Sequence, residues 1–296
     1  MIRDFFNTNN FEYLHDESLK KYNTYKVDIK AKYIVFPENV SQLKIIIEYL
    51  KEKKIKYMIL GNGSNVIFAI DYYDGVIIKL DKLNNLNINK NIVEVEAGYS
   101  LIKLSMETIN NGLSGLEFAC GIPGTVGASV AMNAGAYNED MSTIVKEVIV
   151  LDENGNIKKL NNKELNYTYR NSVLKEHPKY IVLKAIIELA YKDKEEMLKL
   201  VQERRKRRID TQPLEYPSAG SVFRNPQGNY AGHLIEECNL KGYNLNGAEV
   251  SQKHANFIIN KDNAKGTDIE KLIKYIQKEV FKKFNINLIL EQIIVK

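Results

Sequence analysis

The sequence contains little cysteine and histidine, and their scarcity argues against several kinds of site. Two cysteines, Cys120 and Cys238, lie far apart with no paired spacing. This usage fits a reducing compartment and disfavours a disulfide framework or a thiolate metal site. The four histidines form no His-x-x-x-His pattern, so we expect no bound metal.

A run of apolar residues suited to a membrane is also missing. The first residues, Met-Ile-Arg-Asp-Phe-Phe-Asn, lack the charged and then apolar pattern of a secretory signal. One long uncharged stretch, residues 119–137, contains Pro123, four glycines and several polar side chains, which suit lipid poorly. We therefore expect a cytoplasmic protein with no membrane partner.

The chain has only a small excess of charge, with a formal net charge of +5. This balance suits an anionic small ligand as readily as a nucleic acid. The densest basic run is residues 204–208, Arg-Arg-Lys-Arg-Arg, at the end of a predicted helix that starts near Asp193. These side chains could be solvated and compensate the helix dipole, bind a ligand phosphate, or bind a polynucleotide. Because no aromatic residues are interleaved with them, we expect no nucleic-acid partner.

With 296 residues and 44% apolar content, the chain is long enough for two or three domains. Apolar spacing predicts a βαβ unit from a strand at 33–36, a helix at 40–54 and a strand at 55–60, with the two strands forming a parallel pair. Ser100 is a predicted N-cap for a helix that ends at Asn111 and Gly112. Further predicted elements are strands at 76–80, 92–97, 180–191, 256–260 and 288–295, a hairpin of 147–151 with 157–160, and helices at 193–208 and 268–284, with residues 210–213 as a linker.

Two glycine-rich segments are candidates for binding a phosphate-bearing ligand. The turn Gly61-Asn-Gly-Ser-Asn65 is neither a Walker loop nor a dinucleotide fingerprint, which needs glycine where the chain has Val66. In residues 119–137 small side chains let backbone N–H groups approach an anion, and we expect positive φ at Gly121, Gly124 and Gly127. The two segments could bind the two ends of one ligand; a simple turn and tight backbone packing are the alternatives.

Three polar residues are candidates for chemistry. Arg170 lies in a strand-like alternation of aromatic and small polar residues, where a guanidinium can bind a carboxylate or a developing enolate, unless it is simply solvated. Ser221 lies in a loop constrained by proline and glycine that presents its hydroxyl, unless it only caps a turn. Glu291 occupies an apolar terminal strand, which is costly unless the carboxylate is paired or faces outward.

Seven motifs, taken in order, resemble the UDP-N-acetylenolpyruvoylglucosamine reductase (MurB) family over roughly residues 20–295. They are Gly61-Asn-Gly-Ser-Asn65, Gly115-Leu-Glu-Phe-Ala-Cys-Gly-Ile-Pro-Gly124, Met132-Asn-Ala-Gly-Ala-Tyr137, Tyr169-Arg-Asn-Ser172, Gln212-Pro-Leu-Glu-Tyr-Pro-Ser218, Gly220-Ser-Val-Phe223 and Lys253-His-Ala-Asn-Phe257. The resemblance implies an α+β fold with an FAD-binding domain of the vanillyl-alcohol-oxidase (PCMH) type. Its two lobes would be residues 1–75, the βαβ lobe, and 76–209, followed by an α+β substrate domain at 210–296.

The resemblance also implies a reaction. With FAD as cofactor and NADPH as hydride donor, the family reduces UDP-N-acetyl-3-O-(1-carboxyvinyl)-glucosamine to UDP-N-acetylmuramate for peptidoglycan, as a UDP-N-acetylmuramate dehydrogenase. The expected partner is this UDP-sugar, and we expect a monomer of the shorter-loop (type II) branch. The alternatives are another FAD oxidoreductase of the same fold that acts on a phenol or hydroxy acid, and a protein that binds polynucleotides through residues 204–208.

Matching the motifs residue by residue implies roles for individual side chains. Ser221 falls on the proton-donor serine, Arg170 on the catalytic arginine and Glu291 on the catalytic glutamate. The implied FAD contacts are Gly61, Asn62, Gly63, Ser64, Asn65, Gly121, Ile122, Pro123, Gly124, Thr125, Gly127, Ala128, Asn133, Gly135 and Ala136. The implied substrate contacts are Tyr169, Arg170, Arg224, Lys253, His254 and Asn256. The chain departs from the family at Asp28-Ile29, where relatives have Gly-Gly, and at Ile293, where they have a basic residue.

Overall fold

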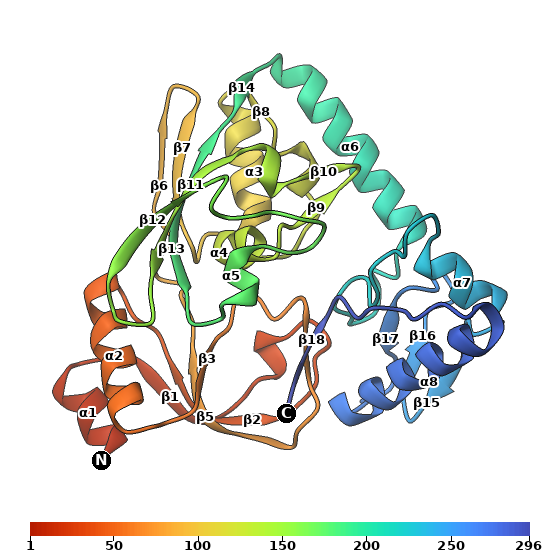
Figure 1. The fold of residues 1–296 in the computed structure, drawn as a ribbon, viewed down its shortest axis with the longest axis horizontal. Helices are drawn as coiled ribbons and strands as arrows, with labels where there is room; N and C mark the ends of the chain where they lie inside the picture. The colour runs from red at the N-terminus through yellow and green to blue at the C-terminus, as the bar shows by residue number, and fades with distance from the viewer. The chain divides into compact units, whose positions relative to one another are not determined.

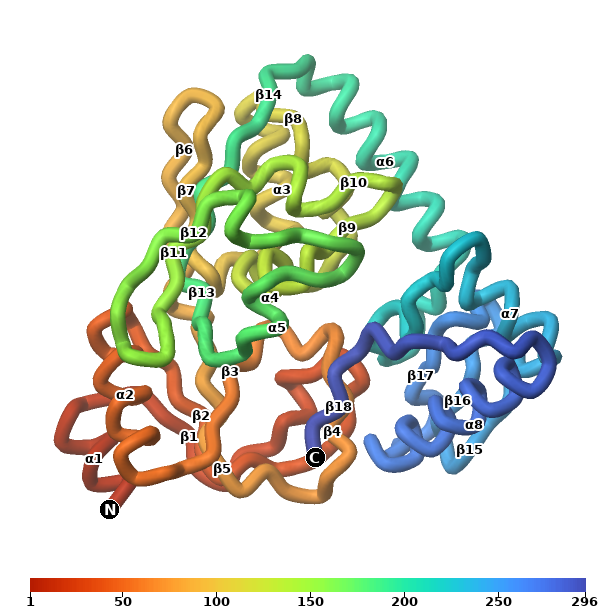
Figure 2. The backbone as a smooth tube through the Cα atoms, in the orientation of Figure 1, coloured from red at the N-terminus to blue at the C-terminus, as the bar shows by residue number.

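The computed structural model describes residues 1–296, which form two compact units (Figures 1 and 2). The first unit contains Met1–His15, Tyr33–Gly61 and Gly75–Lys206, and the second contains Asp16–Lys32, Asn62–Asp74 and Arg207–Lys296. Each unit is therefore built from three separate segments of the chain. None of the helices combines the length and the apolar composition that crossing a bilayer requires.

Helices and strands are mixed along the whole chain, as in an α+β protein. The helices are α1 (Ile2–Thr8), α2 (Val40–Glu52), α3 (Leu101–Asn110), α4 (Val126–Ala131), α5 (Val173–Glu176), α6 (Lys194–Thr211), α7 (Ala231–Glu237) and α8 (Gly266–Phe284), with 3₁₀ turns at Lys20–Tyr22, Glu117–Ala119 and Met141–Thr143. The strands are β1 (Tyr13–Ser18), β2 (Lys30–Val35), β3 (Tyr57–Ile59), β4 (Val66–Phe68), β5 (Tyr72–Ile78), β6 (Leu86–Asn89), β7 (Ile92–Glu96), β8 (Leu113–Ser114), β9 (Gly135–Ala136), β10 (Glu139–Asp140), β11 (Val145–Leu151), β12 (Ile157–Asn161), β13 (Ile181–Glu188), β14 (Ala190–Tyr191), β15 (Asn244–Leu245), β16 (Ala248–Val250), β17 (Ile258–Asn260) and β18 (Ile293–Val295).

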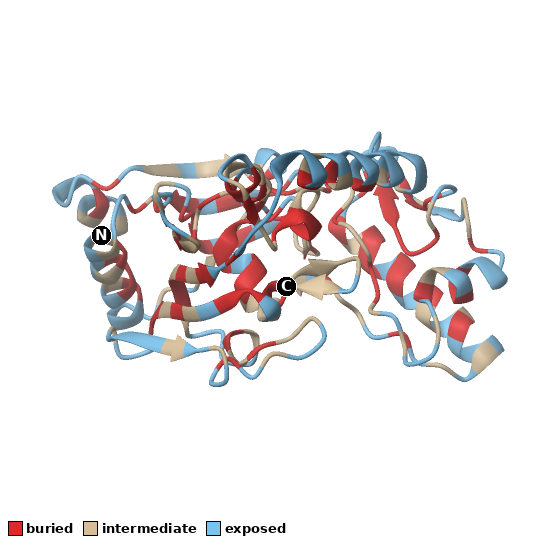
Figure 3. Cartoon of the chain, turned by 90° about the horizontal axis from the view of Figure 1, so that it is seen from above, coloured by how far each residue is buried: buried red, intermediate tan, exposed pale blue.

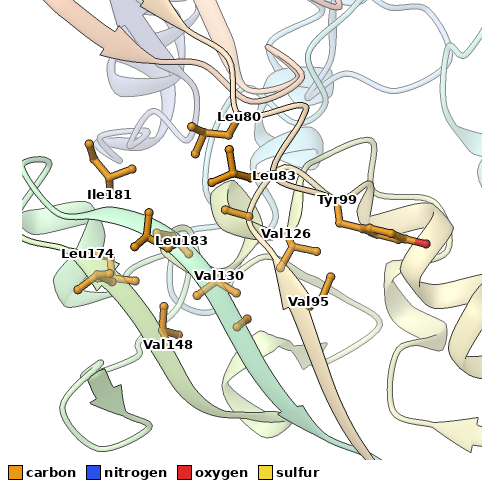
Figure 4. Close-up of a cluster of buried hydrophobic side chains, with 14 of the residues drawn as sticks. Leu80, Leu83, Val95, Tyr99, Val126, Val130, Val148, Leu174, Ile181 and Leu183 are labelled. Carbon is orange, nitrogen blue, oxygen red and sulfur yellow. The ribbon is translucent and has the colours of Figure 1, made fainter. Parts of the chain in front are cut away.

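The first unit is organised around an antiparallel sheet of five strands in the order β12-β11-β13-β7-β6. Helix α4 packs against this sheet (Figure 1). Figure 4 shows Val126 and Val130 of α4 among buried side chains of the sheet strands, which include Val95, Val148 and Leu183. The uncharged segment 119–137 thus passes directly over a hydrophobic core.

The elements of the predicted βαβ unit are present, but their predicted pairing is wrong. A second sheet has the order β1-β2-β5-β3, so β5 lies between β2 and β3. The parallel partner of β3 is β5, with Tyr57 opposite Val76 and Ile59 opposite Ile78. Val76, Ile77 and Ile78 are all fully buried, and such a continuous apolar run is typical of a strand that is covered on both faces of its sheet.

Local signals placed several other elements correctly. The Ser100 side chain accepts a hydrogen bond from the backbone N–H of Lys103 at the start of α3, and Gly112 follows the helix with φ of +70°. The predicted hairpin is present as β11 paired with β12. Helix α6 continues to Thr211, through half of the predicted linker, and ends shortly before Pro213.

The second unit combines a small sheet with a long helix. Strands β15, β16 and β17 are antiparallel, and α8 packs beside them. Helix α8 buries one stripe of residues, and Figure 3 shows buried turns alternating with exposed ones along it. The predicted strand at 288–295 is shortened to β18, which pairs in parallel with β4.

Candidate active site

The glycines of segment 119–137 allow close packing rather than unusual backbone angles. A Cβ atom added to Gly124 would lie 2.8 Å from Ser129 Oγ, and one added to Gly127 would lie 2.8 Å from the Cβ of Ala97. Neither these two glycines nor Gly121 has a positive φ, so that prediction is wrong. Their small size lets α4 approach β7 and its neighbours, which a larger residue would prevent.

The left-handed backbone positions of this segment lie further along, at Asn133 and Tyr137, with φ of +46° and +58°. The buried side-chain amide of Asn133 donates to Asp140 Oδ2 and to the carbonyl of Thr168, each at 3.0 Å. Its oxygen accepts from the backbone N–H of Ser142 at 3.0 Å. The side chain of Asn133 is therefore engaged in organising the loop, and its backbone N–H donates to the Val130 carbonyl at 3.2 Å.

The start of the early glycine turn lies against segment 119–137. A Cβ atom on Gly61 would lie 2.9 Å from Thr125 Oγ1 and 3.4 Å from the Cβ of Ala128. Beneath the turn, Lys79 is 2% exposed, and its ammonium donates to the Gly61 carbonyl at 2.6 Å and pairs with Asp81 at 3.1 Å. The two predicted ligand-binding segments thus meet at Gly61, next to a buried cation.

The rest of the early turn belongs to the second unit. Gly63 has φ of +62°, and a Cβ atom there would overlap the backbone carbonyl of Tyr22. The Gly63 carbonyl accepts from the N–H of Thr24 at 3.2 Å, and the side-chain amide of Asn65 donates to the Glu291 carbonyl at 3.2 Å. Asn65 therefore connects the turn to the segment that contains one of the predicted catalytic residues.

Arg170 lies at a tight turn and not in the predicted strand-like segment. Thr168 and Asn171 exchange two backbone hydrogen bonds of 3.1 Å across the turn, and Arg170 has φ of +57°. Its Nη2 donates to the Gly135 carbonyl at 2.6 Å, and its guanidinium carbon lies 5.1 Å from the centre of the half-exposed Tyr169 ring. The left-handed conformation costs energy for a non-glycine residue, and such strain clusters at functional sites.

Ser221 and Glu291 lie on two neighbouring segments of the second unit. The backbone N–H of Glu291 donates to the carbonyl of Val222 at 2.8 Å, and Phe223 forms an antiparallel bridge with Leu290. Glu291 is partly buried, as is Ser221. Pairing between the segments therefore places the backbone of Glu291 opposite Val222, the residue after the candidate serine.

A buried glutamine fixes the backbone just before Ser221. Gln292 Nε2 donates to the carbonyls of Ala219 at 3.0 Å and Gly220 at 3.2 Å. Its oxygen accepts from the hydroxyl of Tyr25 at 3.0 Å, and burial raises the pKa of that hydroxyl. Sequence reasoning missed Gln292 and Tyr25; the signal available was a second polar residue beside Glu291 in an apolar stretch.

Asn256 fixes the backbone just after Ser221. Its side chain, which is 4% exposed, accepts from the N–H of Phe223 at 3.0 Å and donates to the Phe223 carbonyl at 2.8 Å. Its own carbonyl accepts from the N–H of Val222 at 2.9 Å. Asn256 was predicted to contact substrate, and in the structure its amide is engaged with the loop that presents Ser221.

The other predicted substrate residues of the second unit have protein partners of their own. The ammonium of Lys253 donates to the Ile209 carbonyl at 2.5 Å and lies 3.9 Å from a Glu215 oxygen. Burial lowers the pKa of His254, which lies against Phe257. The backbone N–H of Arg224 donates to the Ile289 carbonyl at 2.9 Å, two residues before Glu291.

Relatives of known activity match nearly the whole chain. The UDP-N-acetylenolpyruvoylglucosamine reductase of Caldicellulosiruptor bescii is 46% identical over 277 residues, which are 93% of this chain and 88% of that protein. The protein of the same name from Bacillus pumilus is 39% identical and covers 93% of this chain and 91% of its own length. This chain belongs to the UDP-N-acetylenolpyruvoylglucosamine reductase family.

Solved structures and domain families agree with membership of the reductase family. The crystal structure of the UDP-N-acetylenolpyruvylglucosamine reductase from Thermus caldophilus has a TM-score of 0.82 at 32% identity and covers 97% of this chain and 99% of its own. Residues 31–161 match an FAD binding domain, and residues 212–295 match the C-terminal domain of UDP-N-acetylenolpyruvoylglucosamine reductase. The chain is therefore an FAD-dependent oxidoreductase, as the motifs predicted.

More distant structures share the fold alone. The Physcomitrella patens BBE-like 1 protein has a TM-score of 0.52 at 18% identity, and a solvent-stable cholesterol oxidase has 0.51 at 14%. The predicted α+β fold with an oxidase-type FAD-binding domain is confirmed.

The residues of the reductase fit FAD, because a dinucleotide diphosphate needs cations and small side chains at close range. The buried ammonium of Lys79 lies beside the turn at Gly61, and segment 119–137 adds no carboxylate. Glycine at position 61 lets the early turn lie close to Thr125, since an added Cβ atom would be 2.9 Å from Thr125 Oγ1. Small side chains, a nearby cation and the absence of carboxylates in segment 119–137 are therefore compatible with an anionic cofactor.

Proposed function

We propose that this reductase transfers hydride from NADPH, through FAD, to UDP-N-acetyl-3-O-(1-carboxyvinyl)-glucosamine, giving UDP-N-acetylmuramate for peptidoglycan. The observation that carries the proposal is the backbone pairing of Val222 and Phe223, directly after Ser221, with the segment of Glu291, in a chain of this family. An enolpyruvyl ether suits the side chains of Arg170, Ser221 and Glu291.

Bound FAD supplies the hydride, and the protein supplies geometry and electrostatics. Hydride addition to the β-carbon of an enolpyruvyl group leaves negative charge that spreads into the carboxylate. Arg170 stabilises this charge, since a guanidinium already fixed by the Gly135 carbonyl needs little reorganisation.

Ser221 donates its proton to the α-carbon. A serine hydroxyl is a weak acid, so the proton transfer requires that the hydroxyl be held close to the α-carbon. Gln292 and Asn256 hydrogen-bond to the loop on either side of Ser221 and fix its backbone. Glu291, on the segment paired with this loop, acts as a protonated carboxyl that donates a hydrogen bond to the developing enolate oxygen. Two paired segments therefore carry the proton donor and the acid.

The motifs also suggest which residues contact the cofactor and the substrate. FAD contacts come from the turn 61–65 and segment 121–136, and Tyr169, Arg224, Lys253 and His254 contact substrate. Asn256 contributes through its backbone and its hold on the Ser221 loop. The functional divisions are residues 1–75, 76–209 and 210–296, and the enzyme acts as a monomer in the cytoplasm.

Single-turnover kinetics of Ser221→Ala test the proposal. Flavin reduction by NADPH should persist, while reoxidation of the flavin by the enolpyruvyl substrate should slow by about 10²- to 10⁴-fold, the usual contribution of a positioned acid. Ser41→Ala, on the exposed face of α2, is the matched control and should behave as the unmodified protein. Unchanged reoxidation in Ser221→Ala would remove the serine from its role. Reduction of the flavin by a phenol or hydroxy acid, with no reoxidation by the UDP-sugar, would favour the alternative enzyme class.

A further inference from the structure

One arginine of the basic run points into the first unit. Helix α6 is mostly exposed (Figure 3), yet Arg204 is only 9% exposed. Its Nη2 lies 2.6 Å from Glu139 Oε1, and its guanidinium carbon lies 4.6 Å from the centre of the Tyr137 ring. Its neighbours Arg205, Lys206 and Arg207 are exposed. Arg204 is therefore the buried arginine of a run whose other members are exposed or half-buried.

Arg204 binds both parts of a very short hairpin. Strands β9 and β10 pair Gly135 with Asp140 and Ala136 with Glu139, and the turn residues Tyr137 and Asn138 both have positive φ, +58° and +62°. Two residues of this kind form the tight turn that fits the twist of a hairpin. The Tyr137 hydroxyl also donates to the Arg204 carbonyl at 3.2 Å. Because such a short hairpin is barely stable by itself, these contacts to α6 determine where it lies.

The same hairpin holds the guanidinium of Arg170. The Gly135 carbonyl accepts from Arg170 Nη2 at 2.6 Å, and the Asn133 carbonyl lies 3.5 Å from Nη1. A Cβ atom on Gly135 would overlap Glu139 and Asp140, so the chain can place this carbonyl only with glycine here. The acceptor that orients Arg170 therefore lies on the hairpin that Arg204 anchors.

We propose that Arg204, with Glu139 and Tyr137, is a positioning residue for Arg170, an inference that rests on the proposed role of Arg170. Truncating the buried Arg204 removes its ion pair with the partly exposed Glu139 and its contact with the Tyr137 ring, so the hairpin is expected to move. The Gly135 carbonyl then moves as well, and Arg170 loses its fixed orientation. A displacement of about 1 Å at a catalytic group can cost about 100-fold in rate.

The test compares Arg204→Met with Arg205→Met, a matched change on the exposed face of the same helix. Arg204→Met should slow flavin reoxidation by substrate about 10- to 100-fold and leave flavin reduction by NADPH unchanged, whereas Arg205→Met should change neither. Glu139→Gln should produce a weaker effect of the same kind and serves if Arg204→Met folds poorly. Equal rates in Arg204→Met and Arg205→Met would overturn the inference.

A second readout needs no turnover. In the apoprotein, the Nε–Hε NMR signal of Arg170, assigned by its loss in Arg170→Lys, should shift and exchange faster with solvent in Arg204→Met but not in Arg205→Met. An unperturbed signal would show that Arg204 does not act through Arg170.

The double variant separates this inference from the proposed function. If Arg204 acts through Arg170, adding Arg204→Met to Arg170→Lys should slow reoxidation little further. Full multiplication of the two effects would overturn the positioning role while leaving the catalytic role of Arg170 intact. No slowing in Arg170→Lys itself would instead overturn the proposed role of Arg170, and with it the role of Arg204.

Discussion

Single residues with left-handed backbone serve different purposes in this protein. Arg170 adopts φ of +57° at the tip of its turn, where the conformation directs a guanidinium toward a carbonyl. Gly63 adopts φ of +62° where the backbone of Tyr22 leaves no room for a side chain. At Arg170 backbone strain accompanies a proposed functional role, whereas at Gly63 glycine adopts the left-handed conformation without strain.

Substitution at Gly63 should therefore be more costly than substitution at another left-handed glycine. Gly228 has φ of +73° with no atoms within 4 Å of an added Cβ, so Gly228→Ala should cost only the strain, about 1–2 kcal/mol. Gly63→Ala adds an overlap with backbone, and its loss of unfolding free energy should be clearly larger. Urea unfolding of the two apoprotein variants measures both values, and equal losses would show that the Tyr22 backbone yields.

The catalytic candidates could be predicted from the sequence, but the contacts that position them could not. Ser221 and Arg170 lie in two of the seven motifs, and Glu291 is an acid in an apolar stretch. Gln292 and Asn256 bind backbone that lies 73 and 33 residues away, so their local sequence does not reveal which segment they contact. Positive φ in segment 119–137 was predicted for its glycines, yet packing against Ala97 determines their role.

At the scale of elements, local sequence signals predicted helices and hairpins correctly, but the pairing of strands distant in the sequence was predicted wrongly. The N-cap at Ser100 and the Asp-Glu-Asn-Gly-Asn turn depend on residues a few positions apart, and α3 and the β11–β12 hairpin lie where they were predicted. In the structure β5 lies between β2 and β3. Whether β2 pairs with β3 or with β5 depends on how these apolar strands compete for the same neighbour. A short apolar run does not carry that information.

The β11–β12 hairpin gives a prediction about pH. Asp152 accepts from the N–H groups of Asn154 and Asn156, each at 2.8 Å, and lies 2.9 Å from the Lys158 ammonium. The hydrogen bond from Lys158, aided by these amides and opposed by burial, lowers the pKa of Asp152 from 3.8 to about 2. A carboxylate whose pKa is lowered on folding stabilises the protein above its ordinary pKa, and this contribution is lost as the pH falls through the folded value.

Asp152→Asn should therefore lower the urea midpoint at neutral pH, and the difference from the unmodified protein should shrink as the pH approaches about 2. Glu203→Gln, an exposed change on α6, is the control and should leave the midpoint nearly unchanged at both pH values. A difference that stays constant with pH would mean that the Asp152 charge does not stabilise the hairpin.

At the scale of the whole molecule, the chain order and the compact units do not coincide. The second unit needs Asp16–Lys32 and Asn62–Asp74 as well as the C-terminal residues. Strand β18 has β4 as its parallel partner, and the hydroxyl of Tyr25 donates to Gln292. The Tyr25 carbonyl accepts from the buried amide of Asn260 at 2.8 Å. Residues 210–296 alone would lose all of these contacts.

We therefore expect the fragment 210–296 not to fold by itself, although it spans the region that matches the C-terminal domain of the family. Without β4 the edge of β18 is unpaired, and without Tyr25 the buried amides of Gln292 and Asn260 lose partners, each at a cost of about 1–3 kcal/mol. These losses are comparable with the whole stability of a small domain. Circular dichroism and ¹H–¹⁵N NMR of the fragment should show a poorly dispersed, non-cooperatively melting chain, whereas the full chain melts cooperatively. Dispersed signals and a sharp transition in the fragment would mean that α8 and the β15–β17 sheet suffice, and that the first 74 residues only add to a unit that is already stable.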